Sequence, residues 1–512
     1  MKRLLSFLLL GVAANSFLAS LDLAADQSSK QPNIIFILAD DLGWSDTSLY
    51  GTTKLYQTPN IERLAKRGMT FSRAYSDSPL CSPTRASILT GQIPLRHGST
   101  RPEHHTKAVR MAPTYKNNTP ASNKVISVNT ATRLDNKLPT LGKLIKNAGY
   151  TTGHFGKWHL GPKPYSPLEH GFDVDIPNHP GPGPAGSYVA PWRFKNFKAN
   201  SPKEHIEDRM AEEAIAWMKS VKDKGPFFMN YWMFSVHGPW NAKQDLVEKY
   251  KKLIQPGDRQ QSAIYAAMIE SMDDAVGSLL NAVDEAGIAD ETVIIFVSDN
   301  GGNMYSKIDG VFPTDNYPLR GGKASMCEGG IRVPCVISWP GVTQDETRSE
   351  ELIQTSDFYP TILNQLGIEI PVDHKVDGID ISPALAGKKL NRKGIVNYFP
   401  FPAMVPDWVP SSISLHSGDW KLLRLFHQGE NGAHAYNLYN LAEDIGEKND
   451  LADKYPERVK EMDRIIEAVI QDTGGLVPKP NPNFDPAQYR PQQIGKPTEE
   501  FMKKHWKTSK KK

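Results

Sequence analysis

The sequence predicts an α/β fold in which a β-sheet is sandwiched between layers of helices, followed by a smaller antiparallel sheet with a covering helix. Along residues 31–387, short apolar runs rich in branched residues alternate with segments of helical periodicity. Such runs are typical of strands buried on both faces. Their alternation with helices indicates helical layers on both sides of one sheet. After about residue 387, short strand patterns separated by turn residues mark the second unit.

Three of the apolar runs end abruptly at acidic, amide or imidazole side chains. In a sheet covered by helices, ligands bind beyond the carboxyl ends of the strands, so these residues are the first functional candidates. The run over 33–39 is followed by Asp40 and Asp41, the run over 227–236 by His237, and the run over 292–298 by Asp299 and Asn300.

The predicted helices have recognisable boundaries. Pro59 suits the first turn of a helix, and Gly149 and Gly474 suit the position just after the last turn. The helices of the main unit begin at Pro59, cover 141–148 and cover 263–286. In the second unit, residues 411–426 predict two strands around a turn, and residues 456–472 predict an amphipathic helix.

Composition and the two ends of the chain limit the function. The 512 residues hold 60 Lys and Arg against 57 Asp and Glu, a balance that argues against a nucleic-acid-binding or membrane-surface protein. Residues 1–25 combine a charged start, an apolar stretch and small residues, as in a signal peptide, and a membrane anchor is the less favoured alternative. We therefore expect an exported protein, periplasmic or secreted, with no membrane span in the mature chain. Its main domain would cover 31–387, and a C-terminal subdomain with a basic tail 388–512.

The polar strand ends predict a metal site. Asp40, Asp41, Asp299 and Asn300 would bring three carboxylates and one amide oxygen to one edge of the sheet. Hard oxygen ligands suit Ca²⁺ or Mg²⁺, whereas zinc prefers more nitrogen or sulfur. Without a cation the carboxylates would repel one another. Each pair taken alone also reads as an ordinary turn, and only the two together favour a metal.

Cysteine usage raises a separate question. An exported chain with three cysteines, Cys81, Cys327 and Cys335, leaves one thiol unpaired by arithmetic. Cys327 and Cys335 could pair or stay as buried free thiols. Cys81 lies four residues before Arg85, whereas cysteine phosphatases place the arginine six residues later, and Pro83 removes a backbone donor that a phosphate loop needs. On this pattern alone an inert buried thiol is as plausible as a functional one.

The segment Cys81-Ser82-Pro83-Thr84-Arg85, followed by Ile88-Leu89-Thr90-Gly91, resembles the signature of the type I sulfatases, which have the alkaline-phosphatase-like fold with a large mixed sheet. A second resemblance covers 149–159, a third covers 319–334, and the Asp pairs fall where that family keeps its calcium ligands. In that family the cysteine is oxidised to Cα-formylglycine, by a formylglycine-generating or equivalent maturation enzyme. The likeness runs from about residue 33 to 340, so 31–387 would be the sulfatase catalytic domain.

The resemblance implies a role for each matched residue. Asp40, Asp41, Asp299, Asn300 and the modified Cys81 would bind one Ca²⁺ per chain. Arg85 would brace the hydrated aldehyde, Lys157 and Lys323 would bind the sulfate, His159 would act as base and His237 as general acid. Many relatives have a second histidine where Trp240 stands, which puts any role at that position in doubt.

The implied chemistry explains why an aldehyde is needed. One hydroxyl of the hydrate attacks sulfur and the ester oxygen leaves; the other loses a proton, the carbonyl re-forms and sulfate is expelled. A serine lacks the second hydroxyl and would stay sulfated.

We expect a sulfated polysaccharide or oligosaccharide as substrate, and a small aryl sulfate as the second choice. The polar segment 97–138, with Arg101, His104, His105, Lys107 and Arg110, either recognises neighbouring sugar charges or is a solvated loop. The alternatives are a phosphatase or phosphonate monoester hydrolase of the same superfold, and a glycan-binding homologue without activity.

Overall fold

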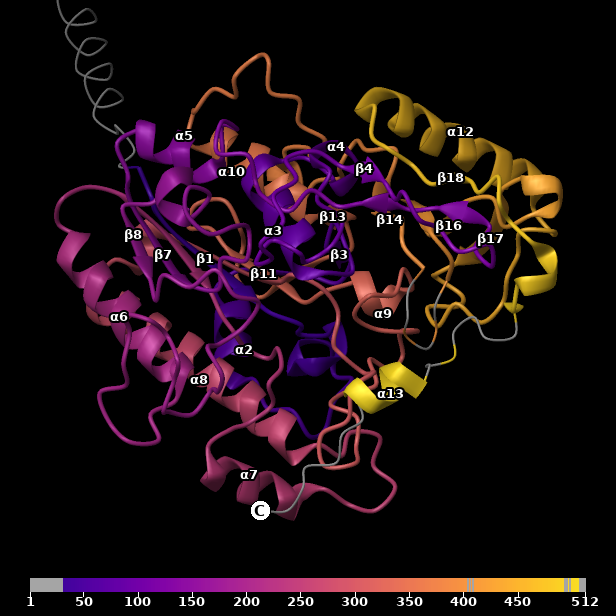
Figure 1. Cartoon of the computed structure of the whole chain (residues 1–512). Coiled ribbons are helices and arrows are strands. Elements are labelled where there is room, and N and C mark those ends of the chain that lie inside the picture. The colour runs from indigo at the N-terminus through magenta and orange to yellow at the C-terminus, as the bar shows by residue number, and fades with distance from the viewer. Residues whose placement is uncertain are drawn as a thin grey trace, which may run out of the picture.

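The computed structural model describes residues 31–402, 405, 407, 409–491, 496 and 499–505. The predicted signal peptide and the end of the basic tail lie outside the described residues. The centre of the molecule is an eight-stranded mixed sheet with the strand order β12-β2-β11-β10-β1-β9-β7-β8 (Figure 1). Its strands are β1 (Asn33–Ala39), β2 (Met69–Phe71), β7 (Thr151–Gly156), β8 (Val174–Ile176), β9 (Phe227–Trp232), β10 (Thr292–Ser298), β11 (Cys335–Ser338) and β12 (Thr347–Ser349).

Helices cover both faces of this sheet, as the sequence predicted (Figure 1). One layer contains α2 (Pro59–Ala65), α6 (Ile206–Val221), α7 (Gln244–Leu253) and α8 (Ala263–Glu285); the other contains α3 (Cys81–Thr90), α5 (Leu141–Asn147) and α10 (Phe358–Gln365). Strand β1 shows why: Ile35 and Ile37 pack in the core under the first layer, whereas Phe36 and Leu38 pack in the core under the second. Each such side chain contributes about 1.5–3 kcal/mol when fully buried.

Strand β9 is shorter than the apolar run 227–236 predicted. It ends at Trp232 because the backbone N–H groups of Phe234 and Ser235 turn away and donate to the buried carboxylate of Glu207, at 3.0 and 2.7 Å. The apolar run continues through this turn because the turn is itself buried. Periodicity therefore identified the burial correctly but not the end of the strand.

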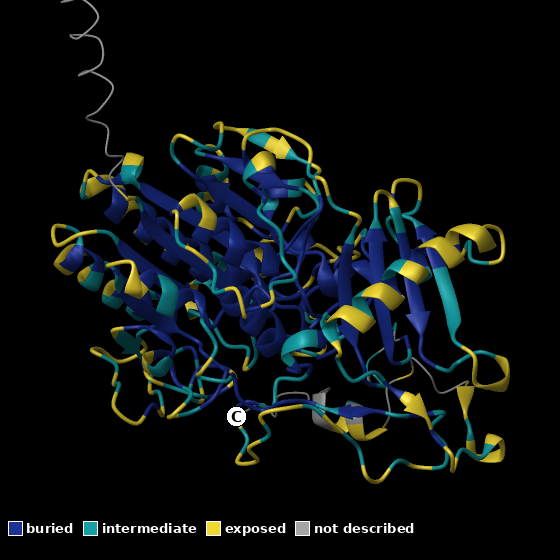
Figure 2. Ribbon diagram, turned by 90° about the horizontal axis from the view of Figure 1, so that it is seen from above, coloured by how far each residue is buried: buried dark blue, intermediate teal, exposed yellow. Residues whose placement is uncertain are grey.

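The second unit is a four-stranded antiparallel sheet of β14 (Ile395–Phe399), β15 (Ser412–Ser417), β16 (Trp420–Leu425) and β17 (Ala435–Asn440), here called the C-terminal sheet. Helix α12 (Pro456–Thr473) lies on it with Val459, Met462 and Ile466 inward, and its outer face is exposed (Figure 2). Gly474 ends the helix in the left-handed conformation, at φ 60°. The predicted antiparallel sheet with a covering helix is confirmed, and the boundary between 387 and 388 stays a prediction.

Shorter elements connect these parts. They are β3 (Ala74–Tyr75), β4 (Thr114–Tyr115), β5 (Val125–Ile126), β6 (Val128–Asn129), β13 (Ile353–Gln354), β18 (Lys479–Pro480), α4 (Pro94–His97), α9 (Glu328–Ile331), α11 (Ser382–Leu385) and α13 (Glu499–His505). Cys81, Cys327 and Cys335 are all buried and free, so the open question of a Cys327–Cys335 pair is answered against a disulfide. Among the described helices, none combines the length and the apolar character that crossing a bilayer requires.

Candidate active site

The candidate residues meet at one edge of the large sheet. Strands β10, β1, β9 and β7 run parallel, so their carboxyl ends lie side by side. The register pairs Ala39 of β1 with Ser298 of β10, and the residues that follow each of them are therefore neighbours. Lys157 directly follows β7, and His237 lies shortly after β9. The predicted convergence of polar strand ends is therefore what the structure shows.

Helix α3 brings Cys81 and Arg85 to this edge. Cys81 is the first residue of the helix, and a spacing of four places both side chains on one helix face. Arg85 is fully buried and donates from Nε and Nη2 to Asp299 Oδ2, at 2.9 and 2.8 Å. Its Nη1 donates to the carbonyl of Lys157 at 2.5 Å. The arginine thus ties helix α3 to two strand ends.

The carboxylates form a pocket of oxygen ligands. Ligand atoms of Asp40, Cys81 and Asp299 all lie within 4.8 Å of one another, and the three side chains are buried. Asn300 Nδ2 donates to Asp41 Oδ1 at 2.9 Å. Among the described residues, Asp40 Oδ1 and Asn300 Oδ1 have no hydrogen-bond partner although both atoms are buried. Unpartnered buried oxygens beside further carboxylates fit a hard divalent cation.

Two lysines neutralise part of this charge. Lys157 Nζ donates to Asp40 Oδ2 and Lys323 Nζ to Asp41 Oδ2, each at 2.6 Å. Burial alone would raise the pKa of Asp41, but Lys323 and His237 outweigh it and hold that pKa low. Burial, with Asp40 close by, raises the pKa of Asp299 to about 6. The site is therefore strained electrostatically at Asp299, where an added cation would favour the ionised form.

His159 faces residue 81. Its Nδ1 lies 3.5 Å from Cys81 Sγ, and its backbone is left-handed at φ 57°. Ser82 Oγ donates to the His159 carbonyl at 2.7 Å and fixes that turn. Burial and nearby Lys157 hold the pKa of His159 well below its usual range, so the imidazole is neutral.

His105 is a further neighbour that the sequence did not assign. Its Nδ1 lies 3.0 Å from His159 Nε2, across 54 residues of chain. For His159 Nδ1 to accept a proton from residue 81, its Nε2 must carry the hydrogen and donate to His105. The only signal in the sequence was the polar segment 97–138 as a whole, because no motif marks His105.

Close backbone approaches explain the glycines of the site motifs. A Cβ on Gly156, which precedes Lys157, would lie 1.9 Å from the Trp232 carbonyl oxygen. A Cβ on Gly301 would lie 1.8 Å from the Gly329 carbonyl oxygen. Neither distance is possible for a real side chain, so these positions need glycine.

The Lys323 loop is fixed from both sides. Lys323 N–H donates to the Gly302 carbonyl at 3.0 Å, and Ala324 N–H donates to the Pro79 carbonyl at 2.8 Å. Ala324 is left-handed at φ 68°.

His237 Nε2 lies 3.9 Å from Asp41 Oδ2. The structure thus brings all ten predicted site residues together, and their catalytic roles stay predictions.

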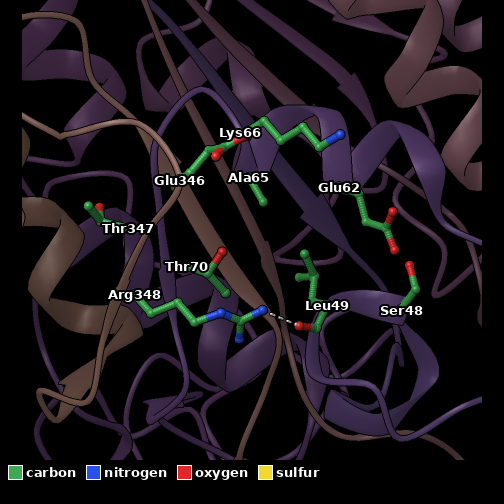
Figure 3. Close-up of a pocket in the computed structure, with 9 residues that line it drawn as sticks. All are labelled: Ser48, Leu49, Glu62, Ala65, Lys66, Thr70, Glu346, Thr347 and Arg348. Carbon is green, nitrogen blue, oxygen red and sulfur yellow. Dashed lines mark hydrogen bonds between the residues drawn. The ribbon is translucent and has the colours of Figure 1, made fainter.

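Another pocket, of about 270 Å³, lies at the sheet edge formed by β2 and β12 (Figure 3). Strand β11 separates this edge from β10. Its lining mixes Glu62, Lys66, Glu346 and Arg348, and Arg348 already donates to the Leu49 carbonyl at 2.7 Å. None of the ten site residues lines it.

Comparison with known proteins agrees with this geometry. A family model described as sulfatase matches residues 32–368, and one described as N-sulphoglucosamine sulphohydrolase, C-terminal, matches residues 322–472. A sulfatase of Formosa agariphila is 30% identical and the match covers 89% of this chain and 90% of the relative. The N-acetylgalactosamine-6-sulfatase of Homo sapiens is 28% identical, and the match covers 89% of this chain and 88% of the relative.

Solved structures give the same fold. The crystal structure of Ps i-CgsB in complex with k-i-k-neocarrahexaose superposes with a TM-score of 0.69 at 27% identity, covering 87% of this chain and 94% of that one. The expected large mixed sheet between helices, with a smaller antiparallel sheet, is therefore confirmed by topology and by likeness to a solved structure.

Proposed function

Because this chain belongs to the sulfatase family and is a sulfuric ester hydrolase, we propose that it removes sulfate from a sulfated carbohydrate with a formylglycine made from Cys81. The observation that carries the proposal is the position of Cys81: buried, at the start of α3, within 4.8 Å of two carboxylates and 3.5 Å from His159. A plain thiol suits this position poorly, since burial raises the pKa of Cys81 and keeps it protonated. An aldehyde hydrate would supply the nucleophile instead.

The oxygen cluster supports one bound Ca²⁺. Asp40, Asp41, Asp299 and Asn300 would hold it together with residue 81, and the unpartnered Asp40 Oδ1 and Asn300 Oδ1 are suited to face it. When bound, the cation supplies Lewis-acid polarisation and lowers the pKa of a coordinated hydroxyl. The all-oxygen donor set favours calcium or magnesium over zinc.

The remaining side chains handle charge and protons. Lys157 and Lys323 carry positive charge beside residue 81 and would bind the sulfate oxygens once the carboxylates are paired with a cation. Neutral His159 would accept the proton of the second hydroxyl at Nδ1, with His105 holding its tautomer. Burial lowers the pKa of His237 to about 3 in the ligand-free site, so His237 would protonate the leaving alcohol only after the charge of the bound sulfate has raised that pKa. Arg85 would keep α3 and Asp299 in register.

The substrate class follows from the relatives. Their names include an N-acetylgalactosamine-6-sulfatase, and Ps i-CgsB is seen with a neocarrahexaose. We extend this to a sulfated glycan for the present chain, outside the cytoplasm, where such polymers occur and where the predicted signal peptide would direct it. The maturation enzyme would act on residues 81–85 before the helix α3 is buried, because every residue of α3 is buried in the fold.

The experiment is peptide mass spectrometry over residues 79–96, coupled to a sulfate-release screen with defined sulfated oligosaccharides. Formylglycine at position 81 with released sulfate is the expected result. Full activity from a chain whose Cys81 is unmodified would overturn the mechanism. Hydrolysis of phosphonate or phosphate esters in preference to sulfate esters would favour the rival activity of the superfold, and binding without turnover by the modified protein would favour the glycan-binding alternative.

A further inference from the structure

The polar segment 97–138 does not lie free in solvent. Through His105 it reaches His159 of the catalytic centre, and at Arg101 and Lys116 it reaches Phe401, just beyond β14. The segment therefore connects the catalytic centre with the C-terminal sheet. It also carries basic side chains whose role the sequence did not decide: they could recognise charges on a sugar or simply be solvated.

Phe401 lies close to the catalytic centre. It belongs to a buried cluster that includes Leu80, the residue before Cys81, and against which Ala324, the residue after Lys323, also packs. A group bound over Phe401 would therefore lie on the side of the centre to which Leu80 and Ala324 belong. The ring is only 1% exposed, so it forms a floor and is not available to stack on a sugar.

Two cations cover this floor. The guanidinium carbon of Arg101 lies 4.2 Å from the Phe401 ring centroid, and Lys116 Nζ lies 5.9 Å from it. The backbone at Arg101 is fixed, because the N–H groups of Thr100 and Arg101 both donate to Thr130 Oγ1, at 2.8 and 3.2 Å. The backbone that carries the guanidinium is thus held in place before any ligand arrives.

The anionic compensation of these cations is weak, since Arg101 Nη1 makes one long ion pair with Glu103 Oε1, at 3.9 Å. Among the described residues, neither side chain donates a hydrogen bond, and Glu103 already accepts from Arg110 at 2.7 Å. Burial lowers the pKa of both groups, and Arg101 lowers that of Lys116 further. Two like charges held over one ring, with the local carboxylate already shared, fit an anionic ligand.

We propose that Arg101 and Lys116, over the floor of Phe401, form a second anion-binding site that takes a sulfate or carboxylate on the sugar next to the one being desulfated. The site rests on the proposed function, since it assigns the substrate to glycans with more than one anionic group. It would raise affinity for such glycans without touching the reacting ester. A small aryl sulfate would not reach it.

The test uses the full-length modified enzyme and the double variant Arg101→Met/Lys116→Met, which keeps apolar stems over Phe401. Substrates are matched oligosaccharides with the same cleavable sulfate, whose neighbouring sugar is neutral, carboxylated or sulfated, together with 4-nitrophenyl sulfate. We expect KM to rise about tenfold for the anionic neighbours, as for loss of a charge-assisted contact, with kcat nearly unchanged. For the neutral neighbour and the aryl sulfate both constants should stay within about twofold. If KM rises more for the sulfated neighbour, the ligand of the site is sulfate; if it rises more for the carboxylated neighbour, the ligand is carboxylate.

Controls separate this site from general charge effects and from the proposed function. Lys137→Met removes an exposed lysine of the same segment and should leave all four substrates unchanged. Arg101→Lys should recover part of the affinity. Calorimetric binding of the doubly anionic oligosaccharide to a Cys81→Ala background gives a readout that needs no turnover: about tenfold weaker binding on adding the double substitution supports the site even if sulfatase activity is absent. Equal losses on all substrates, or no loss on any, would overturn the proposal.

Discussion

The catalytic centre and the junction with the C-terminal sheet both bury several charges, but they arrange them differently. At the junction, Glu328 accepts from His416, Lys421 and Tyr75, at 2.7, 3.1 and 2.7 Å, and Lys421 Nζ also lies 2.7 Å from Glu447 Oε1. Signs alternate, and each oxygen of Glu328 has a hydrogen-bond partner. Burial would raise the pKa of Glu328, but Lys421 and His416 outweigh it and hold that pKa well below its usual range.

At the catalytic centre, by contrast, ligand atoms of Asp40, Asp299 and Cys81 lie within 4.8 Å of one another, and Asp40 Oδ1 accepts no hydrogen bond among the described residues. A network in which opposite charges alternate serves to join two parts of a fold, whereas carboxylates gathered at one place store a charge imbalance that a ligand can relieve. Lys323 and Glu328 are only five residues apart, so one short segment serves both purposes. Removing one charge should therefore cost activity in the first region and stability in the second.

Replacing the nucleophile should have the largest effect. Cys81→Ala cannot form the aldehyde, so we expect at least about a 10³-fold loss of kcat, because nucleophile removal has effects of that size. The melting temperature should stay within a few degrees, because the two side chains differ by one atom. Sulfate release and differential scanning calorimetry on the same preparation check both halves. Retained turnover would contradict the role of residue 81.

Breaking the junction should instead reduce stability. Lys421→Met leaves Glu328 and Glu447 buried with less compensation, which we expect to lower the free energy of unfolding by about 3–5 kcal/mol. Denaturant unfolding measures this change. Adding Glu447→Gln to the variant should restore part of the loss, since it removes one uncompensated charge. If the single variant were as stable as wild type, the junction would not depend on this pair.

Removing the cation should sharpen the contrast between the two regions. Chelation should abolish most activity and destabilise the protein by about 2–3 kcal/mol relative to saturating Ca²⁺. The Asp299 pKa of about 6 in the metal-free fold lies above its unfolded value of 3.8, so the folded chain binds more protons between those pH values. Metal-free stability should therefore fall as the pH rises from about 4 to 6, and the stabilisation by Ca²⁺ should grow over that window.

Melting temperatures with and without Ca²⁺ at pH 4.5 and pH 7 measure this difference. If Ca²⁺ raised the melting temperature by the same amount at both pH values, the assignment of the charge imbalance to Asp299 would be contradicted. Asp299→Asn serves as the matched variant, because it should remove the pH dependence of the increment while weakening calcium binding.

The smallest effect is expected at the edge of the centre. His105→Ala should lower kcat about tenfold with little change in KM, because His159 would lose the acceptor that fixes its tautomer. His105→Asn offers a carbonyl oxygen as a substitute acceptor and should recover part of the rate. Lys137→Met provides an unaffected reference. A change confined to KM would place His105 in substrate binding instead.

Much of the centre was predictable from the sequence because it depends on local rules. Buried parallel strands are continuous apolar runs, and the residues after them lie at one edge whatever the rest of the chain does. That rule located Asp40, Asp41, Asp299 and Asn300. A spacing of four on a helix placed Cys81 and Arg85 together, and the family resemblance supplied the remaining residues. The same periodicity could not place the end of β9, because the turn that follows it is equally apolar.

The sequence by itself determined the layered α/β class, the antiparallel C-terminal sheet and the strand ends that supply the oxygen ligands, since burial and turn chemistry are encoded in neighbouring residues. Only the tertiary structure decided that His105 meets His159, that Arg101 and Lys116 lie over Phe401, and that Lys421 reaches Glu328. These contacts join distant segments of the chain. They form only when the loops and the C-terminal sheet pack against the large sheet, and no local pattern of residues signals that packing.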